Sequence, residues 1–169
     1  MVDRPHLLMS ESPLAAPVPS DPVELAQLAT QIVLADLVAG RLTRLVLLTF
    51  RGLSVKTWEI AGQTSAMDDL VRAIARLESA QALAFVYPSP VPPGVEGERG
   101  YLVAAESASG AADCFVALRG GQPPGGAECQ LSYRRIQGAP SRWFGVEPEN
   151  EVNVWMEGPA GIIAPDEEL

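Results

Sequence analysis

The sequence predicts an α+β domain of two layers, in which a mainly antiparallel sheet of five to six strands carries two main helices on one face. Apolar residues recur at intervals of three and four in the segments 22–39 and 66–79, which is typical of helices. The other apolar segments have the length of strands and end at Gly-rich or Pro-rich breaks. The expected elements follow in the order α-β-β-α-β-β-β-β, which favours the α+β class.

The first helix is expected over residues 22–39, with Gly40 ending it. Asp21 is a good N-cap, Pro22 suits the first helical position, and Glu24 completes a capping box. Three residues widen the apolar surface beyond one stripe: Leu34, Leu37 and Val38. We therefore expect this helix to be deeply buried or to form part of a subunit interface.

Two strands, 42–50 and 53–60, are expected next, joined by Arg51-Gly52 in a tight hairpin. This register places Arg44 opposite Glu59. Both faces of the pair carry apolar residues, so we expect a central hairpin that is covered at least partly on each side.

A second helix is expected over 66–79, with Ser65 as its N-cap. Four strands are expected after it, and the last two form a hairpin: 82–87, 100–106, 113–118 and 128–135. The segment 88–99 holds four prolines, which cannot continue a sheet, so we expect a stiff surface loop there.

The two cysteines bear on the register of the last hairpin. Cys114 and Cys129 are symmetric about a turn centred between Gly121 and Gln122, so we expect them to face each other on the buried face of the sheet. We expect free thiols that act as small apolar side chains rather than a disulfide.

Charge and tails define the expected domain organisation. We expect a disordered arm over residues 1–20, a single domain over 21–145 and an acidic segment over 146–169, which holds seven acidic residues and no basic one. The net charge of −9 disfavours nucleic acid and an anionic membrane surface as partners. No apolar run is long enough to span a bilayer or to act as a signal peptide, so we expect a cytoplasmic protein.

The scarcity of reactive side chains excludes much common chemistry. The single histidine is His6 and the single lysine is Lys56, which argues against triad hydrolases, His-ligated metals and Walker-type phosphate binding. The Gly-rich run 119–126 lies between strands and lacks the P-loop pattern, and the acidic run 147–153 lacks the EF-hand pattern. We therefore expect no cofactor and no metal.

The remaining candidate groups are carboxylates, arginines and aromatics. The possible carboxylate pairs are Asp68 with Asp69, whose adjacent helical positions point in different directions, and Glu106 with Asp113, which surface-turn composition also explains. The candidate anion contacts are Arg134, Arg135 and Arg142. Three aromatic residues either complete the core or form a partner surface: Trp143, Phe144 and Trp155.

In element order alone, the expected fold resembles the roadblock and longin-type regulatory domains, and this resemblance implies a dimeric scaffold for small GTPases or motors. Our first hypothesis is a non-enzymatic cytoplasmic interaction or regulatory domain, a homodimer that binds a protein partner through helix 22–39 or a sheet edge. The alternative is a small enzyme or anionic-ligand-binding module that uses carboxylates and arginines. A pocket where two carboxylates and an arginine converge would favour the alternative.

Overall fold

The structure, a computed structural model, describes residues 5–41, 45–62, 66–120, 127–138, 140–156 and 161–163, and only the backbone of Ala127, Trp155 and residues 161–163. The helices are α1 (Pro22–Val38) and α2 (Met67–Leu77). The strands are β1 (His6–Pro13), β2 (Leu45–Arg51), β3 (Ser54–Ala61), β4 (Ala82–Pro88), β5 (Arg99–Ser107), β6 (Gly110–Gly120), β7 (Ala127–Ile136), β8 (Val152–Met156) and β9 (Gly161–Ile163). From α1 to β7 the elements follow the expected order, and β1, β8 and β9 are additional.

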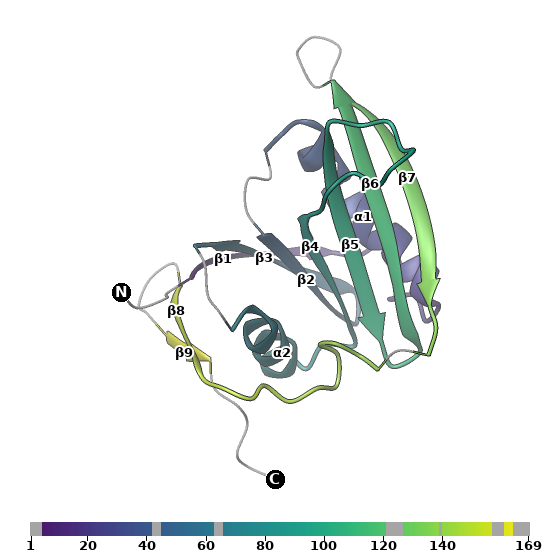
Figure 1. Cartoon of the computed structure of the whole chain (residues 1–169). Helices are drawn as coiled ribbons and strands as arrows, with labels where there is room; N and C mark the ends of the chain where they lie inside the picture. Colours follow the sequence, from purple (N-terminus) through teal and green to yellow (C-terminus); the bar gives the residue numbers. More distant parts are fainter. Residues whose placement is uncertain are drawn as a thin grey trace.

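The strands form one sheet in the order β7-β6-β5-β4-β2-β3-β1-β8-β9. The seven strands from β7 to β1 pair antiparallel, and β8 lies parallel to the start of β1 (Figure 1). The α+β class is confirmed, but the expected five to six strands are too few. Among the described residues, no helix is long and apolar enough to cross a membrane.

The N-terminal segment differs from the prediction of a disordered arm over residues 1–20. Residues 6–13 form β1, which pairs with β3 from His6 opposite Ala61 to Pro13 opposite Ser54. The proline stands at the last position of the strand, where it does least harm to the ladder of hydrogen bonds. Leu7 on this strand is 1% exposed. The disordered-arm prediction is therefore wrong for these residues.

The two helices lie on opposite faces of the sheet, so the fold has three layers, and the prediction of two layers with both helices on one face is wrong (Figure 1). Successive side chains of a strand point to opposite faces. On β2, Leu48 packs in the core beneath α1, while Leu47 packs in the core beneath α2. A strand that is buried on both faces needs a covering layer on each.

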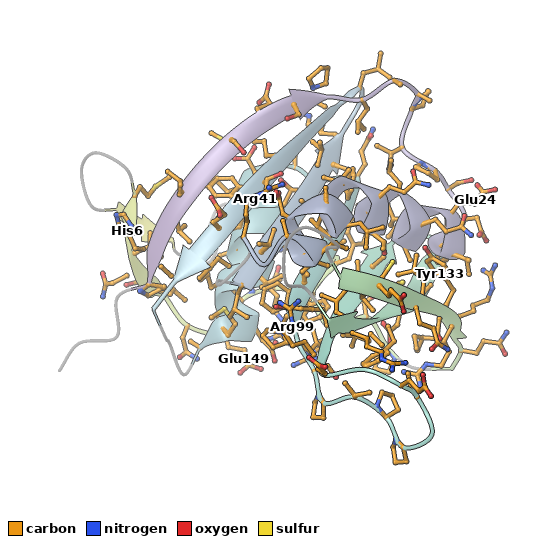
Figure 2. All side chains as sticks on the ribbon, turned by 90° about the horizontal axis from the view of Figure 1, so that it is seen from above. His6, Glu24, Arg41, Arg99, Tyr133 and Glu149 are labelled. Atoms are coloured by element: carbon orange, nitrogen blue, oxygen red, sulfur yellow. The ribbon has the colours of Figure 1, made fainter. Side chains whose placement is uncertain are left out.

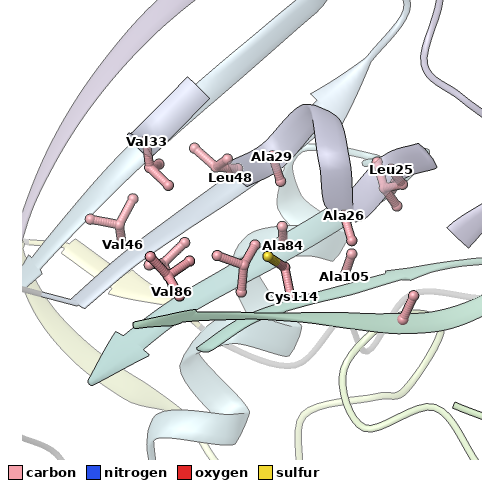
Figure 3. Close-up of a cluster of buried hydrophobic side chains, with 14 of the residues drawn as sticks. Leu25, Ala26, Ala29, Val33, Val46, Leu48, Ala84, Val86, Ala105 and Cys114 are labelled. Atoms are coloured by element: carbon pink, nitrogen blue, oxygen red, sulfur yellow. The ribbon is translucent and has the colours of Figure 1, made fainter. Parts of the chain in front are cut away.

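The core beneath α1 contains small side chains where the helix crosses the sheet. Ala26 and Ala29 are fully buried and face the strand residues Leu48 and Ala84 in the same cluster (Figure 3). The small side chains of Ala26 and Ala29 let this part of α1 lie close to the sheet, while Leu25, Val33 and Leu37 fill the core on the same side of the helix. This packing fixes the position of α1 on the sheet.

The core beneath α2 draws residues from both ends of the chain. Leu7 of β1 and Val152 and Val154 of β8 are buried there with Trp58 and Ile74. The expected domain limits of 21–145 therefore cut through this core. The rest of the acidic segment, residues 157–160 and 164–169, lies outside the described residues.

The hairpin registers differ from the predicted ones by an even number of positions. The β2–β3 turn is Gly52-Leu53 rather than Arg51-Gly52, and Gly52 adopts the left-handed φ of 60° that such a turn needs. Glu59 consequently lies opposite Val46, and Arg44 is outside the described residues. Because the shift is even, the predicted faces of both strands are retained.

In the last hairpin, the two cysteines do not face each other. Cys114 lies opposite Tyr133, and Cys129 lies opposite Leu118. Both cysteines are free, as expected, but only Cys114 is buried. The prediction that both thiols are buried is wrong for Cys129, because β7 extends beyond the covered part of the sheet. The turn itself, residues 121–126, lies outside the described residues.

The helix ends follow the capping rules at α1 but not at α2. The Asp21 carboxylate accepts a hydrogen bond of 3.1 Å from the N–H of Glu24, with proline in the first turn. The helix α2 begins after Ala66 without a side-chain cap, and the expected cap Ser65 lies outside the described residues.

Candidate functional site

The outermost strand β7 is the most exposed regular element among the described residues. It lies at one end of the strand order and pairs with β6 alone, so no described strand covers its outer edge (Figure 1). Every side chain from Glu128 to Arg135 is exposed. An edge strand of this length presents a row of unpaired N–H and C=O groups, which can accept another strand.

The two faces of β7 differ in chemistry. Cross-strand neighbours share a face, so three residues of β7 extend the α1 side of the sheet: Cys129, Leu131 and Tyr133. The opposite face carries Glu128, Gln130, Ser132 and Arg134. Leu131 and Tyr133 are each 36% exposed, and they are among the few large apolar side chains that the described surface leaves open.

Tyr133 joins the strand to the helix layer. Its side chain lies alongside α1, near the hydroxyl of Thr30 and the thiol of Cys114 (Figure 2). Partial burial raises the pKa of Tyr133, and deeper burial raises the pKa of Cys114. Both groups therefore stay neutral at physiological pH, and neither has the lowered pKa of a reactive nucleophile.

The predicted anion contacts Arg134 and Arg135 point to opposite faces of β7, so they do not form one anion site. Arg134 pairs with Asp113 at 2.9 Å, and Arg135 pairs with Asp21 at 2.7 Å. The Arg135 hydrogen bond, aided by the N–H of Glu24, lowers the pKa of Asp21. Each arginine therefore forms an ion pair within the chain, one on each face of the edge strand.

The third predicted anion contact, Arg142, lies in the segment that follows β7. Its guanidinium is 3.3 Å from the carboxylate of Asp68 and 4.7 Å from the ring centroid of Trp143. An ion pair and a cation–π contact occupy this side chain. The structure does not bring Arg142 together with the other two arginines to bind one ligand.

The predicted partner surface on α1 is largely covered by the chain itself. Leu37 is 1% exposed and belongs to the core beneath the helix. Leu34 and Val38 are half-buried and pack against the same core. The helix thus buries the apolar side that suggested a subunit interface, which leaves the sheet edge as the other predicted surface.

Of the aromatic residues near the C-terminus, the two whose side chains are described belong to the core or pack against it. Trp143 is 2% exposed, packs edge-to-face on Phe85 at 5.5 Å, and donates its indole N–H to Asp68 at 2.9 Å. Phe144 is half-buried against the same core. The side chain of Trp155 lies outside the described residues. A buried Trp143 cannot present its ring to a partner.

Glu106, predicted as one of a carboxylate pair with Asp113, has a different role. Its carboxylate accepts hydrogen bonds from the backbone N–H groups of Arg142, Trp143 and Phe144 at 3.1, 2.9 and 2.9 Å. Asp113 is engaged with Arg134 instead. This buried carboxylate anchors the C-terminal segment and has no free oxygen to serve as an acid or base.

A polar cleft of about 650 Å³ lies between the start of α2 and the segment after Trp143. Asp68, Asp69 and Arg142 line it, which is the convergence that a ligand-binding alternative requires. Asp69, however, accepts from the N–H of Glu149 at 2.8 Å and from the amide of Asn150 at 3.1 Å. The chain itself thus engages both oxygens of Asp69 and one oxygen of Asp68, so these carboxylates hold the C-terminal segment in place.

We call the hydrogen bonds from Glu149 and Asn150 to Asp69 the latch, and the pKa of Asp69 reflects them. Burial alone raises the pKa, but the hydrogen bonds from Glu149 and Asn150, with the charge of Arg72, outweigh it and hold the pKa below its ordinary 3.8. Asp69 is therefore ionised at neutral pH and stabilised by its partners, unlike a general acid, whose pKa is raised.

Lys56 is the single lysine of the chain and hence its one side-chain amine. Its ammonium lies 2.6 Å from the Glu78 carboxylate and 4.0 Å from that of Glu11, beside a pocket of about 250 Å³. Its amine is therefore engaged in ion pairs with two carboxylates of the same chain. Within the described residues, no group of three or more His, Cys, Asp or Glu side chains is arranged to hold a metal.

Comparison of the chain with models of known families, with curated proteins and with solved structures finds no match. Sequence reasoning found the hairpin that ends in β7 but missed its exposure. The available signal was composition: β7 reads AECQLSYRRI, with few core-type residues, whereas the adjacent β6 contains the apolar run CFVAL.

Proposed function

We propose that this chain is a non-enzymatic interaction or regulatory domain, and that its partner surface is the open edge of β7. The single observation that carries the proposal is a strand of ten residues at the end of the sheet whose side chains are exposed on both faces. Partners bind such edges by adding a strand, since the backbone supplies affinity and alternate side chains supply specificity.

The chemistry of the strand supports this role. A solitary edge strand is an aggregation hazard, and proteins usually protect it with inward-pointing charges, prolines or a covering loop. Residues 128–136 contain no proline, and Leu131 and Tyr133 add exposed apolar area. Glu128, Arg134 and Arg135 protect the edge in part, but Leu131 and Tyr133 leave apolar area open to a partner on one face.

A cytoplasmic setting is part of the proposal. Cys114 and Cys129 are free thiols in different surroundings, and Cys129 is exposed. Exposed free cysteines are usual where the compartment keeps thiols reduced.

The alternative, a small enzyme or anionic-ligand-binding module, has weaker support. The cleft beside α2 does gather two carboxylates and Arg142, but Asp68, Asp69 and Arg142 are each engaged with groups of the same chain. Arg134 and Arg135 are likewise paired and lie on opposite faces. An anion would have to displace these contacts before it could bind.

A capture experiment with matched variants tests the proposed surface. Leu131→Lys places a charge on the edge strand, and Leu77→Lys places the same charge on a more exposed leucine at the end of α2. We expect that proteins which bind both the immobilised wild-type chain and the immobilised Leu77→Lys chain will not bind the immobilised Leu131→Lys chain. Identical retention by all three chains, self-association included, would contradict the proposal.

A further inference from the structure

We propose that the strand added to this edge is β7 of a second copy of the chain, paired antiparallel with Leu131 on the twofold axis. This inference deepens the proposed function and depends on it, since it requires β7 to be the partner surface. The pairing joins the two sheets into one continuous sheet, with each α1 on the same side.

Symmetry limits the registers that are available. A twofold axis perpendicular to the sheet maps each face onto the same face of the other copy. Two residues that pair across the interface must therefore have side chains on the same face of β7, so their numbers are equal or differ by an even number. One residue of β7 therefore lies directly opposite the same residue of the other copy, with the axis midway between the two; we describe that residue as being on the axis. For β7, spanning Ala127–Ile136, an axis through Leu131 or through Ser132 gives the longest overlap.

Charge selects between these two registers. With Leu131 on the axis, Glu128 of each copy lies opposite Arg134 of the other, because both are three positions from the axis. With Ser132 on the axis, Glu128 lies opposite Ile136 and Arg134 lies opposite Gln130. Opposite charges directly across a ladder stabilise the pairing, so the Leu131 register is favoured.

Arg134 can bind Asp113 of its own chain and Glu128 of the second copy at the same time. Its ion pair with Asp113 uses one terminal nitrogen, at 2.9 Å, and its side chain remains 73% exposed. The guanidinium has five N–H donors, so it can keep Asp113 and also reach a second carboxylate across the interface.

The uncharged positions also match in this register. Leu131 meets Leu131 at the axis, and Cys129 meets Tyr133, all on the side of α1. Gln130 meets Ser132 on the other face. Apolar side chains thus meet apolar ones, and polar side chains meet polar ones, along most of the strand.

Sedimentation equilibrium of the full chain, from dilute samples to about 100 µM, tests the second copy. We expect the mass of the wild type and of Leu77→Lys to rise from the 17.9 kDa of one chain towards twice that value. For Leu131→Lys, two like charges meet at the axis, so we expect dimerisation to weaken by about tenfold or more. A wild type that stays monomeric, or a dimer indifferent to Leu131→Lys, would overturn the inference.

Engineered disulfides test the register. In a Cys129→Ser background, Leu131→Cys puts the two thiols opposite each other and should give a covalent dimer on oxidation. In the same background, Ser132→Cys leaves the thiols offset along the strands, so we expect little cross-linking. Preferential linking through position 132 would contradict the register. If both tests fail while capture by the wild type still depends on Leu131, the second copy is wrong and the edge surface stands.

Discussion

Glu106 and Trp143 are joined by a hydrogen bond of 2.9 Å from the backbone N–H of Trp143 to the Glu106 carboxylate, although 37 residues separate them. The same carboxylate binds the N–H groups on either side of Trp143. One buried side chain of β5 therefore caps three backbone donors of the C-terminal segment and places the indole ring in the core beneath α2.

Replacing this carboxylate should loosen the segment. Glu106→Gln keeps the shape but removes the charge and one acceptor oxygen, so we expect a loss of about 1–3 kcal/mol in the free energy of unfolding. Urea denaturation measures it. Glu98→Gln, at an exposed loop position, is the matched control and should change stability by less than about 0.5 kcal/mol. Equal stability of the two variants would show that the three hydrogen bonds add nothing.

The burial of Trp143 predicts a large effect for its truncation. Trp143→Ala removes a nearly fully buried ring and leaves Asp68 without its indole donor, so we expect a loss of about 3–5 kcal/mol. Phe144→Ala, at a half-buried ring, should cost less. The same urea titration compares them. A Trp143→Ala chain of wild-type stability would mean that this ring lies on the surface.

The lowered pKa of Asp69 predicts how stability depends on pH. A folded-state pKa below the unfolded value contributes stability that is fully present above the unfolded pKa and is lost as the pH falls through the folded pKa. We therefore expect wild-type stability to decrease below about pH 5 and through the ordinary value of 3.8, and Asp69→Asn to flatten that decrease.

Melting temperatures measured at a series of pH values check this prediction. Asp36→Asn is the control for loss of a carboxylate, because Asp36 forms an exposed ion pair with Arg41 and such pairs contribute little to stability. If Asp69→Asn and wild type lose stability in parallel as the pH falls, the latch does not act through the ionised carboxylate.

The two cysteines should react at very different rates. Cys129 is exposed, whereas burial of Cys114 both blocks access and raises the pKa of its thiol. With Ellman's reagent and dilute native protein, we expect one thiol per chain to react quickly and the second only on unfolding. Cys129→Ser should abolish the fast phase. Two fast thiols in the native chain would contradict the placement of Cys114.

Much of the fold could be predicted from local patterns, and the failures have identifiable physical causes. Asp21, as an N-cap, predicted the start of α1. Gly52 predicted a tight turn between the two strands that follow. The apolar residues on both faces of β2 indicated covering on each side. Placing both helices on one face ignored that observation, and a three-layer fold satisfies it.

The contacts that hold the ends of the chain could not be predicted in the same way. The segment 6–13 has little strand periodicity, because only Leu7 is buried and the backbone ladder with β3 supplies most of the pairing. The roles of Glu106 and Asp69 depend on partners 36 or more residues away, whose approach no local pattern encodes. Exposure of β7 likewise depends on where the covering layers end.

Hydrogen exchange along β7, measured at low and high protein concentration, tests the central claim most directly. We expect the amides of residues 128–136 that point away from β6 to exchange rapidly in dilute solution and to gain protection as concentration rises. Leu131→Lys should prevent that gain. Edge amides that stay unprotected while the wild-type mass doubles, or that are already protected in the dilute monomer, would contradict the account.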